Sequence, residues 1–279
     1  MKKIGFVDYY ISEWHANNYP RWIGEVNEKL GEDFVVSYAW AELDVSPYDG
    51  RTTDEWCEAF GVERCATIAE VCEKADYIIL LAPSNPEKHL GYAKEVLTCG
   101  KRTYIDKTFA PNQAIAKEIF AIGKEGNTPF FSSSALRFCN EYNQIVNPTT
   151  LEIRGGGFTM EEYIIHQIEM LVRNAKTPAV SARVEQIGDN EYMTYVQLEE
   201  GKSATMEFSE KYAEFEIGAN GKPIDMRTPV FPALLTAVLT FFLTGELPFD
   251  SAETLEVMRI RDAVLEGKAN LGKVIPVIR

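Results

Sequence analysis

Hydrophobic positions in the first 125 residues form short runs rich in β-branched and aromatic residues, and these runs alternate with stretches of helical spacing. The run 77–82 is apolar throughout, as central parallel strands are when both of their faces are buried. Such alternation predicts βαβ units on a doubly wound parallel sheet. We expect strands at 3–7, 34–40, 77–82, 102–105 and 130–134, and helices at 19–30, 52–60, 68–74, 87–99 and 111–125.

The pattern changes after Thr128, where the segments between residues 182 and 217 alternate as antiparallel strands do. Residues 191–199 and 203–208 flank Glu200-Gly201-Lys202, which predicts a hairpin. Helical spacing recurs at 159–175, 230–243 and 251–266. The sequence therefore predicts an α/β fold in two domains: a parallel-sheet domain over 1–127, and an α+β domain with a mainly antiparallel sheet over 128–279.

Charge and apolar content narrow the classes of partner. The formal charge is −14 and the pI is about 4.8, which disfavours nucleic acid and anionic membranes, because both attract basic surfaces. The longest apolar stretch, 229–243, is too short for a membrane span and predicts a buried helix. The five cysteines include no C-x-x-C pair, and no signal peptide is evident at the N-terminus, so we expect a reducing cytoplasm.

Candidate chemistry follows the predicted strands, because ligands of open α/β sheets bind beyond the carboxyl ends of the strands. Three such segments carry polar side chains: Asp8 to His15, Pro83-Ser84-Asn85 with His89, and Asp106-Lys107-Thr108. A lysine beside a carboxylate can bind a substrate hydroxyl or transfer a proton, although a surface lysine is the commoner case. The aromatic residues Tyr9, Tyr10, Trp14 and Trp22 fit a sugar-stacking surface or, more commonly, a core.

The predicted helix after Gly155-Gly156-Gly157 places four polar residues on one face, namely Glu162, His166, Glu169 and Arg173. A carboxylate one turn before an imidazole can orient it for acid–base work, and a solvated charged stripe is the alternative. Only three histidines occur in the chain, so we expect no metal site.

These motifs, in this order, resemble the glucose-fructose oxidoreductase and inositol dehydrogenase family. The strand 77–82 leads to Pro83-Ser84-Asn85 and His89, and Gly100-Lys101 leads to Asp106-Lys107-Thr108. Arg137-Phe138 resembles the arginine–aromatic pair that opens the family's second domain. Glu162 and His166 after the three glycines, and the segment 242–246, also fit the family.

The resemblance implies a Rossmann-like N-terminal domain that binds NAD or NADP, and a homo-oligomer formed through the open sheet. It implies hydride transfer on a sugar, cyclitol or related polyol, with Lys107 on the reacting hydroxyl, His166 as acid/base and Glu162 supporting it. Arg137 and Glu169 are the implied substrate-binding residues. The implied cofactor-binding residues are Asp8, Tyr9, Tyr10, Trp40, Pro83, Ser84, Asn85, His89, Asp106 and Lys107.

The sequence also departs from the family. The expected G-x-G-x-x-G loop is occupied by residues 8–13, which contain no glycine and carry Asp8 and Glu13. Three hypotheses follow. The first is an oxidoreductase that holds its nicotinamide in an altered way, and the second is a sugar-binding or scaffold protein that has lost the dinucleotide. The third is a lyase or hydrolase that uses Glu162 and His166 without an exchangeable nicotinamide, or with a metal.

Overall fold

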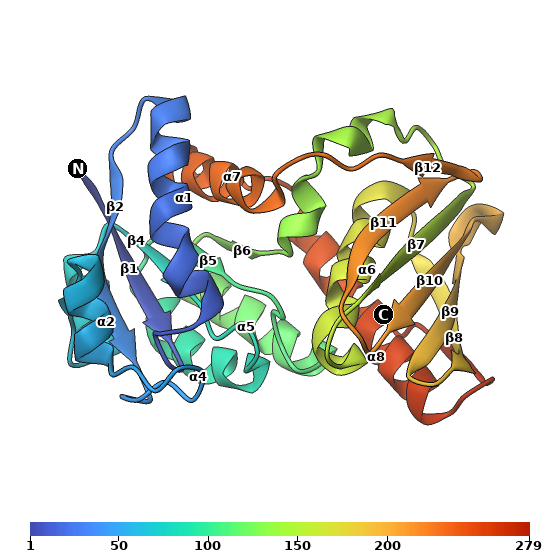
Figure 1. Cartoon of the computed structure of the whole chain (residues 1–279), viewed down its shortest axis with the longest axis horizontal. Coiled ribbons are helices and arrows are strands. Elements are labelled where there is room, and N and C mark those ends of the chain that lie inside the picture. Colours follow the sequence, from blue (N-terminus) through green and yellow to red (C-terminus); the bar gives the residue numbers. More distant parts are fainter. The chain divides into compact units, whose positions relative to one another are not determined.

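Two compact units make up the chain in the computed structural model, which describes residues 1–279 (Figure 1). The first unit consists of Met1–Ser133 and Phe231–Phe249, and the second of Ser134–Val230 and Asp250–Arg279. A segment from the far end of the sequence therefore completes the first unit.

The first unit is built on a sheet of six strands in the order β3-β2-β1-β4-β5-β6, and every neighbouring pair is parallel. This is the strand order of dinucleotide-binding doubly wound folds, in which the order reverses between β1 and β4. The strands are β1 (Lys2–Asp8), β2 (Phe34–Ala41), β3 (Glu63–Arg64), β4 (Tyr77–Leu80), β5 (Thr103–Ile105) and β6 (Phe130–Ser132).

Four helices of the first unit begin at side chains that accept hydrogen bonds from free N–H groups. Thr52 and Glu55 form a capping box at α2, Thr67 caps α3, and Asn112 caps α5. The helices are α1 (Trp14–Leu30), α2 (Thr53–Phe60), α3 (Ile68–Lys74), α4 (Pro86–Val96), α5 (Gln113–Glu125) and α7 (Val230–Thr244).

Helix α1 begins at Trp14 rather than at residue 19, where the sequence predicted its start. Proline favours the first turn of a helix, so Pro20 made residue 19 the natural choice. In the structure Pro20 lies inside the helix, whose N-cap is Glu13.

Helix α7 packs on the first unit through aromatic and polar contacts. The ring of Phe242 stacks on Tyr77 of β4 with centroids 4.8 Å apart, and Arg102 donates from Nη1 to the carbonyl oxygens of Phe242 and Leu243. Figure 1 shows α7 beside α1. No helix in the structure combines the length and the apolar character that crossing a membrane requires.

The second unit contains a sheet of seven strands in the order β12-β11-β7-β10-β9-β8-β13. Only β7 and β10 pair in parallel, and the other neighbours are antiparallel. Helices α6 (Met160–Ala175) and α8 (Ser251–Ala269) pack against each other and the sheet. The strands are β7 (Thr150–Gly156), β8 (Ala179–Gly188), β9 (Glu191–Leu198), β10 (Ser203–Ser209), β11 (Ala213–Ala219), β12 (Lys222–Ile224) and β13 (Val274–Pro276).

The predicted fold class is confirmed by these two sheets. The predicted hairpin is also present, since β9 and β10 pair across the turn with Gln197 opposite Ser203. The strand prediction missed β7, although residues 150–154 alternate between polar and apolar, and it missed the three-residue strand β13, which is too short to show a pattern.

Candidate functional site

The carboxylate of Asp8 joins the ends of β1 and β4. Its Oδ1 atom accepts hydrogen bonds from the backbone N–H of Tyr9 at 2.7 Å and of Ala82 at 3.0 Å. In Rossmann domains the crevice at this reversal of strand order receives the ligand. Asp8 is 1% exposed and its Oδ2 atom has no hydrogen-bond partner. Burial, together with the nearby charge of Glu13, raises the pKa of Asp8 well above its usual range.

The carboxylate of Glu13 caps helix α1. It accepts hydrogen bonds from the backbone N–H groups of His15, at 2.8 Å, and of Ala16. Burial raises the pKa of Glu13, against the opposing effects of the His15 charge and these two hydrogen bonds. A helix N-terminus at this place in a Rossmann fold favours the anionic pyrophosphate, and here it holds a carboxylate of the chain itself.

The turn between β1 and α1 is covered by the segment that follows β2. The hydroxyl of Ser46 donates to the carbonyl oxygen of Ser12 at 2.6 Å, and the hydroxyl of Ser12 donates to Asp49 at 2.7 Å. Leu43 N–H donates to the carbonyl oxygen of Tyr9 at 2.8 Å. Ser12 is fully buried under this segment, whereas Tyr9 and Tyr10 of the same turn are partly exposed.

The acidic residue after β2 is Glu42, and each of its two carboxylate oxygens accepts a hydrogen bond from another side chain. Oε1 lies 2.6 Å from Nζ of Lys88, and Oε2 accepts a hydrogen bond from Tyr92 at 2.7 Å. These bonds hold the pKa of Glu42 below its usual range. Trp40, predicted at this position, packs edge-on against Tyr92, and Lys88 lies over the ring of Tyr9.

Taken together, the residues at this edge do not fit a dinucleotide held in the ordinary Rossmann manner. The phosphate position at the helix N-terminus is taken by Glu13, and Asp8 bridges the crevice. An acidic residue near the end of the second strand usually binds the ribose hydroxyls, and Glu42 is already bound to Lys88 and Tyr92.

Behind this turn, His15 and Asp106 form a buried ion pair. Nδ1 of His15 lies 2.9 Å from Oδ2 of Asp106, which follows β5. Burial alone would lower the pKa of His15, but the charges of Asp106 and Glu13 outweigh it, so this pKa is raised. Burial would conversely raise the pKa of Asp106, and the charges of His15 and Lys107 leave it lowered.

Lys107 lies at the predicted place, directly after β5. It is 8% exposed, and its Nζ donates to the carbonyl oxygen of Pro83 at 3.3 Å. Its backbone N–H donates to Oδ1 of Asp106 at 2.8 Å. The structure therefore brings the segments after β4 and β5 together, as their adjacency in the sheet requires.

The histidine after β4 is fully buried and braces the backbone. Both ring nitrogens of His89 lie near carbonyl oxygens, Nδ1 at 2.9 Å from Phe109 and Nε2 at 2.6 Å from Leu81. Burial lowers the pKa of His89. Asn85 is the N-cap residue of α4, and its Nδ2 donates to Glu87 at 3.1 Å. Ser84 lies in the same turn.

In the second unit, Arg137 and Glu169 form a buried ion pair. Arg137 is 2% exposed; its Nη1 lies 2.6 Å from Oε2 of Glu169, and its Nη2 donates to Glu253. Burial raises the pKa of Glu169, and the charge of Arg137 opposes that rise. These two predicted substrate-binding residues thus contact each other, which fixes the start of the second unit to α6.

The other predicted pair on α6 lies one turn nearer its N-terminus. Nδ1 of His166 lies 2.7 Å from the hydroxyl oxygen of Ser134. The same oxygen accepts a hydrogen bond from the N–H of Leu136 at 3.2 Å, so the hydroxyl hydrogen is available to an unprotonated Nδ1. Glu162 and His166 are both partly exposed, while Glu169 is buried. The helix face is therefore divided between a buried ion pair and an accessible imidazole.

The three glycines before α6 are required by packing. A Cβ atom on Gly157 would lie 2.1 Å from Cγ of Tyr163, and one on Gly155 would lie 2.3 Å from Cδ1 of Phe215. The rings of Tyr163 and Phe215 both adjoin His166, with centroids 5.7 and 5.3 Å away. The glycines thus let two aromatic rings approach the imidazole.

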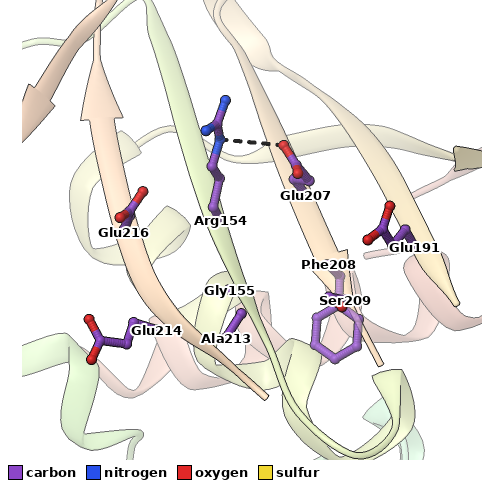
Figure 2. Close-up of a pocket in the computed structure, with 9 residues that line it drawn as sticks. All are labelled: Arg154, Gly155, Glu191, Glu207, Phe208, Ser209, Ala213, Glu214 and Glu216. Atoms are coloured by element: carbon purple, nitrogen blue, oxygen red, sulfur yellow. Dashed lines mark ion pairs between the residues drawn. The ribbon is translucent and has the colours of Figure 1, made fainter. Parts of the chain in front are cut away.

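A pocket of about 270 Å³ lies over β7, β10 and β11 in the second unit (Figure 2). Arg154 stands between Glu207 and Glu216, which are its register partners on the neighbouring strands, and Nε of Arg154 lies 3.3 Å from Glu207. Glu191 and Glu214 also line the pocket, so it is acidic. None of the predicted site residues lines it.

Sequence reasoning missed the roles of Glu13, His15 and Glu42. The available signal was the spacing itself, because these residues follow the first two strands of a parallel sheet directly. Their engagement with one another depends on contacts between distant segments, such as His15 with Asp106. No group of three or more His, Cys, Asp and Glu side chains is arranged to hold a metal ion.

No protein-family model matches the sequence, and neither does any curated protein. Solved structures match along the whole chain. A probable dehydrogenase from Thermotoga maritima has a TM-score of 0.77 at 11% identity, with 99% of each chain covered. The apo scyllo-inositol dehydrogenase from Lactobacillus casei has a TM-score of 0.77 at 14% identity, with 99% of this chain and 98% of the other covered.

An oxidoreductase from Agrobacterium radiobacter, solved with NAD+, L-tartaric acid and magnesium, has a TM-score of 0.76 at 12% identity, and the match covers 99% of this chain and 98% of the other. At these identities the similarity concerns architecture. The chain therefore has the two-unit fold of the glucose-fructose oxidoreductase and inositol dehydrogenase family, as its motifs predicted.

Proposed function

We propose that this protein binds a sugar, cyclitol or related polyol and does not hold a dinucleotide in the manner of its structural relatives. The observation that carries the proposal is the carboxylate of Glu13 on the first N–H groups of α1. A pyrophosphate at this position would have to displace the carboxylate of Glu13 or lie against its charge, and like charges in a buried site are costly.

Two polar side chains could form hydrogen bonds with the hydroxyl groups of such a ligand. Lys107 supplies an ammonium group at the carboxyl edge of the parallel sheet, where ligands of this fold class bind. His166 supplies a partly exposed imidazole in the second unit. The ammonium group donates hydrogen bonds to hydroxyl oxygens, and the imidazole can donate or accept them.

Calorimetric titration with NADH and with NADPH tests the proposal. We expect no heat of binding from the wild-type protein at millimolar cofactor. Glu13→Gln removes the charge that opposes the phosphates, so it should bind at least one cofactor more tightly than the wild-type protein does. Glu25→Gln, on an exposed turn of the same helix, is the matched control. Micromolar binding by the wild-type protein would contradict the proposal.

The second candidate is an NAD(P)-dependent oxidoreductase acting on the CH-OH group of a sugar, cyclitol or related hydroxyl or carbonyl compound. It is favoured by Lys107, which directly follows β5, and by His166 and Glu162 one turn apart on α6. In this candidate Lys107 binds the reacting hydroxyl, His166 is the acid/base, and Arg137 and Glu169 shape the substrate site. Reduction of a nicotinamide by a panel of polyols, abolished in Lys107→Ala, would establish it.

We also propose that the protein forms a homo-oligomer and works in a reducing cytoplasm. We expect a homo-oligomer formed through the sheet of the second unit, since β8 and β9 expose Val180, Ile187 and Tyr195. Light scattering after size-exclusion chromatography tests this, and a monomer at all concentrations would contradict it. All five cysteines are free thiols, which suits a reducing cytoplasm.

A further inference from the structure

Of the three histidines, only His15 is paired with a carboxylate in a buried setting and keeps a free ring nitrogen. Its side chain is 10% exposed, and Nδ1 lies 2.9 Å from Oδ2 of Asp106. No hydrogen bond within the chain involves its Nε2 atom, and Nε2 is not among the fully buried polar atoms that lack a partner. This ring nitrogen can therefore make a hydrogen bond to a ligand or to solvent.

The carboxylate that faces His15 is itself held in place. Oδ1 of Asp106 accepts hydrogen bonds from the backbone N–H of Lys107 at 2.8 Å and from the hydroxyl of Tyr104 at 3.1 Å. The contact between Nδ1 and Oδ2 is an ion pair at 2.9 Å rather than an aligned hydrogen bond. A carboxylate this close stabilises the imidazolium form, as carboxylates do for the imidazoles that transfer protons.

Aromatic rings surround this imidazole on the other sides. Trp14 meets it edge-on with centroids 5.2 Å apart, and Tyr19 and Phe231 lie 5.4 and 5.8 Å away. Trp14 is 44% exposed and also contacts Trp22 and Phe231. An exposed ring next to an imidazole nitrogen that has no partner in the chain combines an apolar surface with one hydrogen-bonding group, as small-molecule sites do.

We propose that His15, held by Asp106, is the polar anchor and proton donor of a ligand site in the first unit, and that a sugar or cyclitol ring lies against Trp14 there. The site deepens the proposed function and rests on its ligand class. The sequence analysis placed Trp14 among residues that fit a sugar-stacking surface, and it gave His15 no role of its own.

The proton balance of the site is simple. In the imidazolium form, Nε2–H donates a hydrogen bond to a hydroxyl or carbonyl oxygen of the ligand. If the proton is transferred, the N–H bond breaks, an O–H bond forms on the ligand, and a neutral imidazole remains beside the ionised Asp106. The charged and titratable groups that face the imidazole are Asp106, Glu13, Lys107 and Tyr19.

The test follows the imidazole nitrogens by NMR while ligand is added. With three histidines the side-chain resonances can be assigned from His15→Gln and His166→Gln. The probes are myo-inositol, D-glucose, D-fructose and D-glucuronate, each added separately. We expect at least one probe to shift Nε2 of His15, and its dissociation constant to rise about tenfold or more in His15→Gln, as loss of a charge-assisted hydrogen bond implies.

Two further variants separate a binding role from a structural one. Trp14→Leu removes the exposed ring and leaves the ion pair in place, so it should weaken binding without changing the pKa of His15. Asp106→Asn should lower that pKa and weaken binding together. His166→Gln is the control for a site in the second unit and should leave the His15 response intact.

The outcomes distinguish this site from the proposed function. If a probe binds equally well to the wild-type protein and to a folded His15→Gln, the His15 site is excluded and the proposed function stands. If no probe binds the wild-type protein, both are excluded.

Discussion

Nη1 of Arg137 lies 2.6 Å from Oε2 of Glu169, and both side chains are almost completely withdrawn from solvent. This pair links the first residues of the second unit to helix α6. Glu169 also accepts a hydrogen bond from the N–H of Ser134 at 3.4 Å. The ion pair therefore holds in place the segment that also carries the Ser134 contact to His166.

Arg137→Met is expected to lower the free energy of unfolding by about 3 to 5 kcal/mol, because it leaves the buried carboxylate of Glu169 without its cation. The double variant Arg137→Met, Glu169→Met should regain part of this loss. Urea denaturation measures both. Arg227→Met, which removes an exposed partner of Asp225, is the control and should have no measurable effect. An equally small effect of Arg137→Met would show that the pair contributes nothing.

Asp8→Asn should change how stability depends on pH. The folded-state pKa of Asp8 is raised, so the folded protein binds this proton more tightly than the unfolded chain. The associated stability is present below the unfolded pKa and is lost as pH rises through the folded pKa. Asparagine cannot ionise, so the stability of the variant relative to wild type should increase as pH rises.

Denaturation midpoints of the two proteins between pH 4 and 9 test this expectation. Asp189→Asn, in the exposed turn between β8 and β9, controls for loss of charge alone. A difference between wild type and Asp8→Asn that stays constant with pH would show that Asp8 titrates normally.

Cys99 is expected to be the most reactive thiol. Its hydrogen bond with Cys72 is the main cause that lowers its pKa to about 6, whereas burial raises the pKa of Cys57 and of Cys65 to about 11. Iodoacetamide at pH 7 should therefore modify Cys99 first, as mass spectrometry of peptides would show.

Variants of Cys72 test whether its hydrogen bond lowers the pKa of Cys99. Cys72→Ala removes the thiol donor and should move the pH midpoint of the Cys99 reaction upward, while Cys72→Ser keeps a donor and should move it less. Identical midpoints in all three proteins would mean that Cys72 does not influence Cys99.

Gly157→Ala should destabilise the second unit by about 1 to 3 kcal/mol, because the added Cβ would overlap the ring of Tyr163. Gly24→Ala, inside α1 with open space around it, is the matched control and should stabilise the protein by about 0.5 to 1 kcal/mol. Opposite signs in thermal denaturation support the packing role of Gly157. A stabilising Gly157→Ala would refute it.

The fold was largely predictable because its signals are local. The apolar run at β4 and the hairpin between β9 and β10 depend on residues close in sequence. The return of α7 to the first unit was not predictable, since its contacts with Tyr77 and Arg102 join residues more than one hundred positions apart.

The candidate site was predictable only in part, for a related reason. The absence of glycine in residues 8–13 indicated a changed phosphate turn. It did not indicate that Glu13 would cap α1, because serine, threonine, aspartate and asparagine are the usual N-cap residues. The pairing of His15 with Asp106 depends on the adjacency of β1, β4 and β5, which appears only once the sheet is assembled.

The return of α7 also has a consequence for how the protein is made. During synthesis the strands of the first sheet leave the ribosome well before Phe231–Phe249, which completes that unit. Until then Phe34 and Tyr77, whose rings contact each other, lack their contacts with Phe242. The first unit can therefore complete its fold only after the strands of the second unit have been translated. The apolar surface that α7 contacts stays exposed until then.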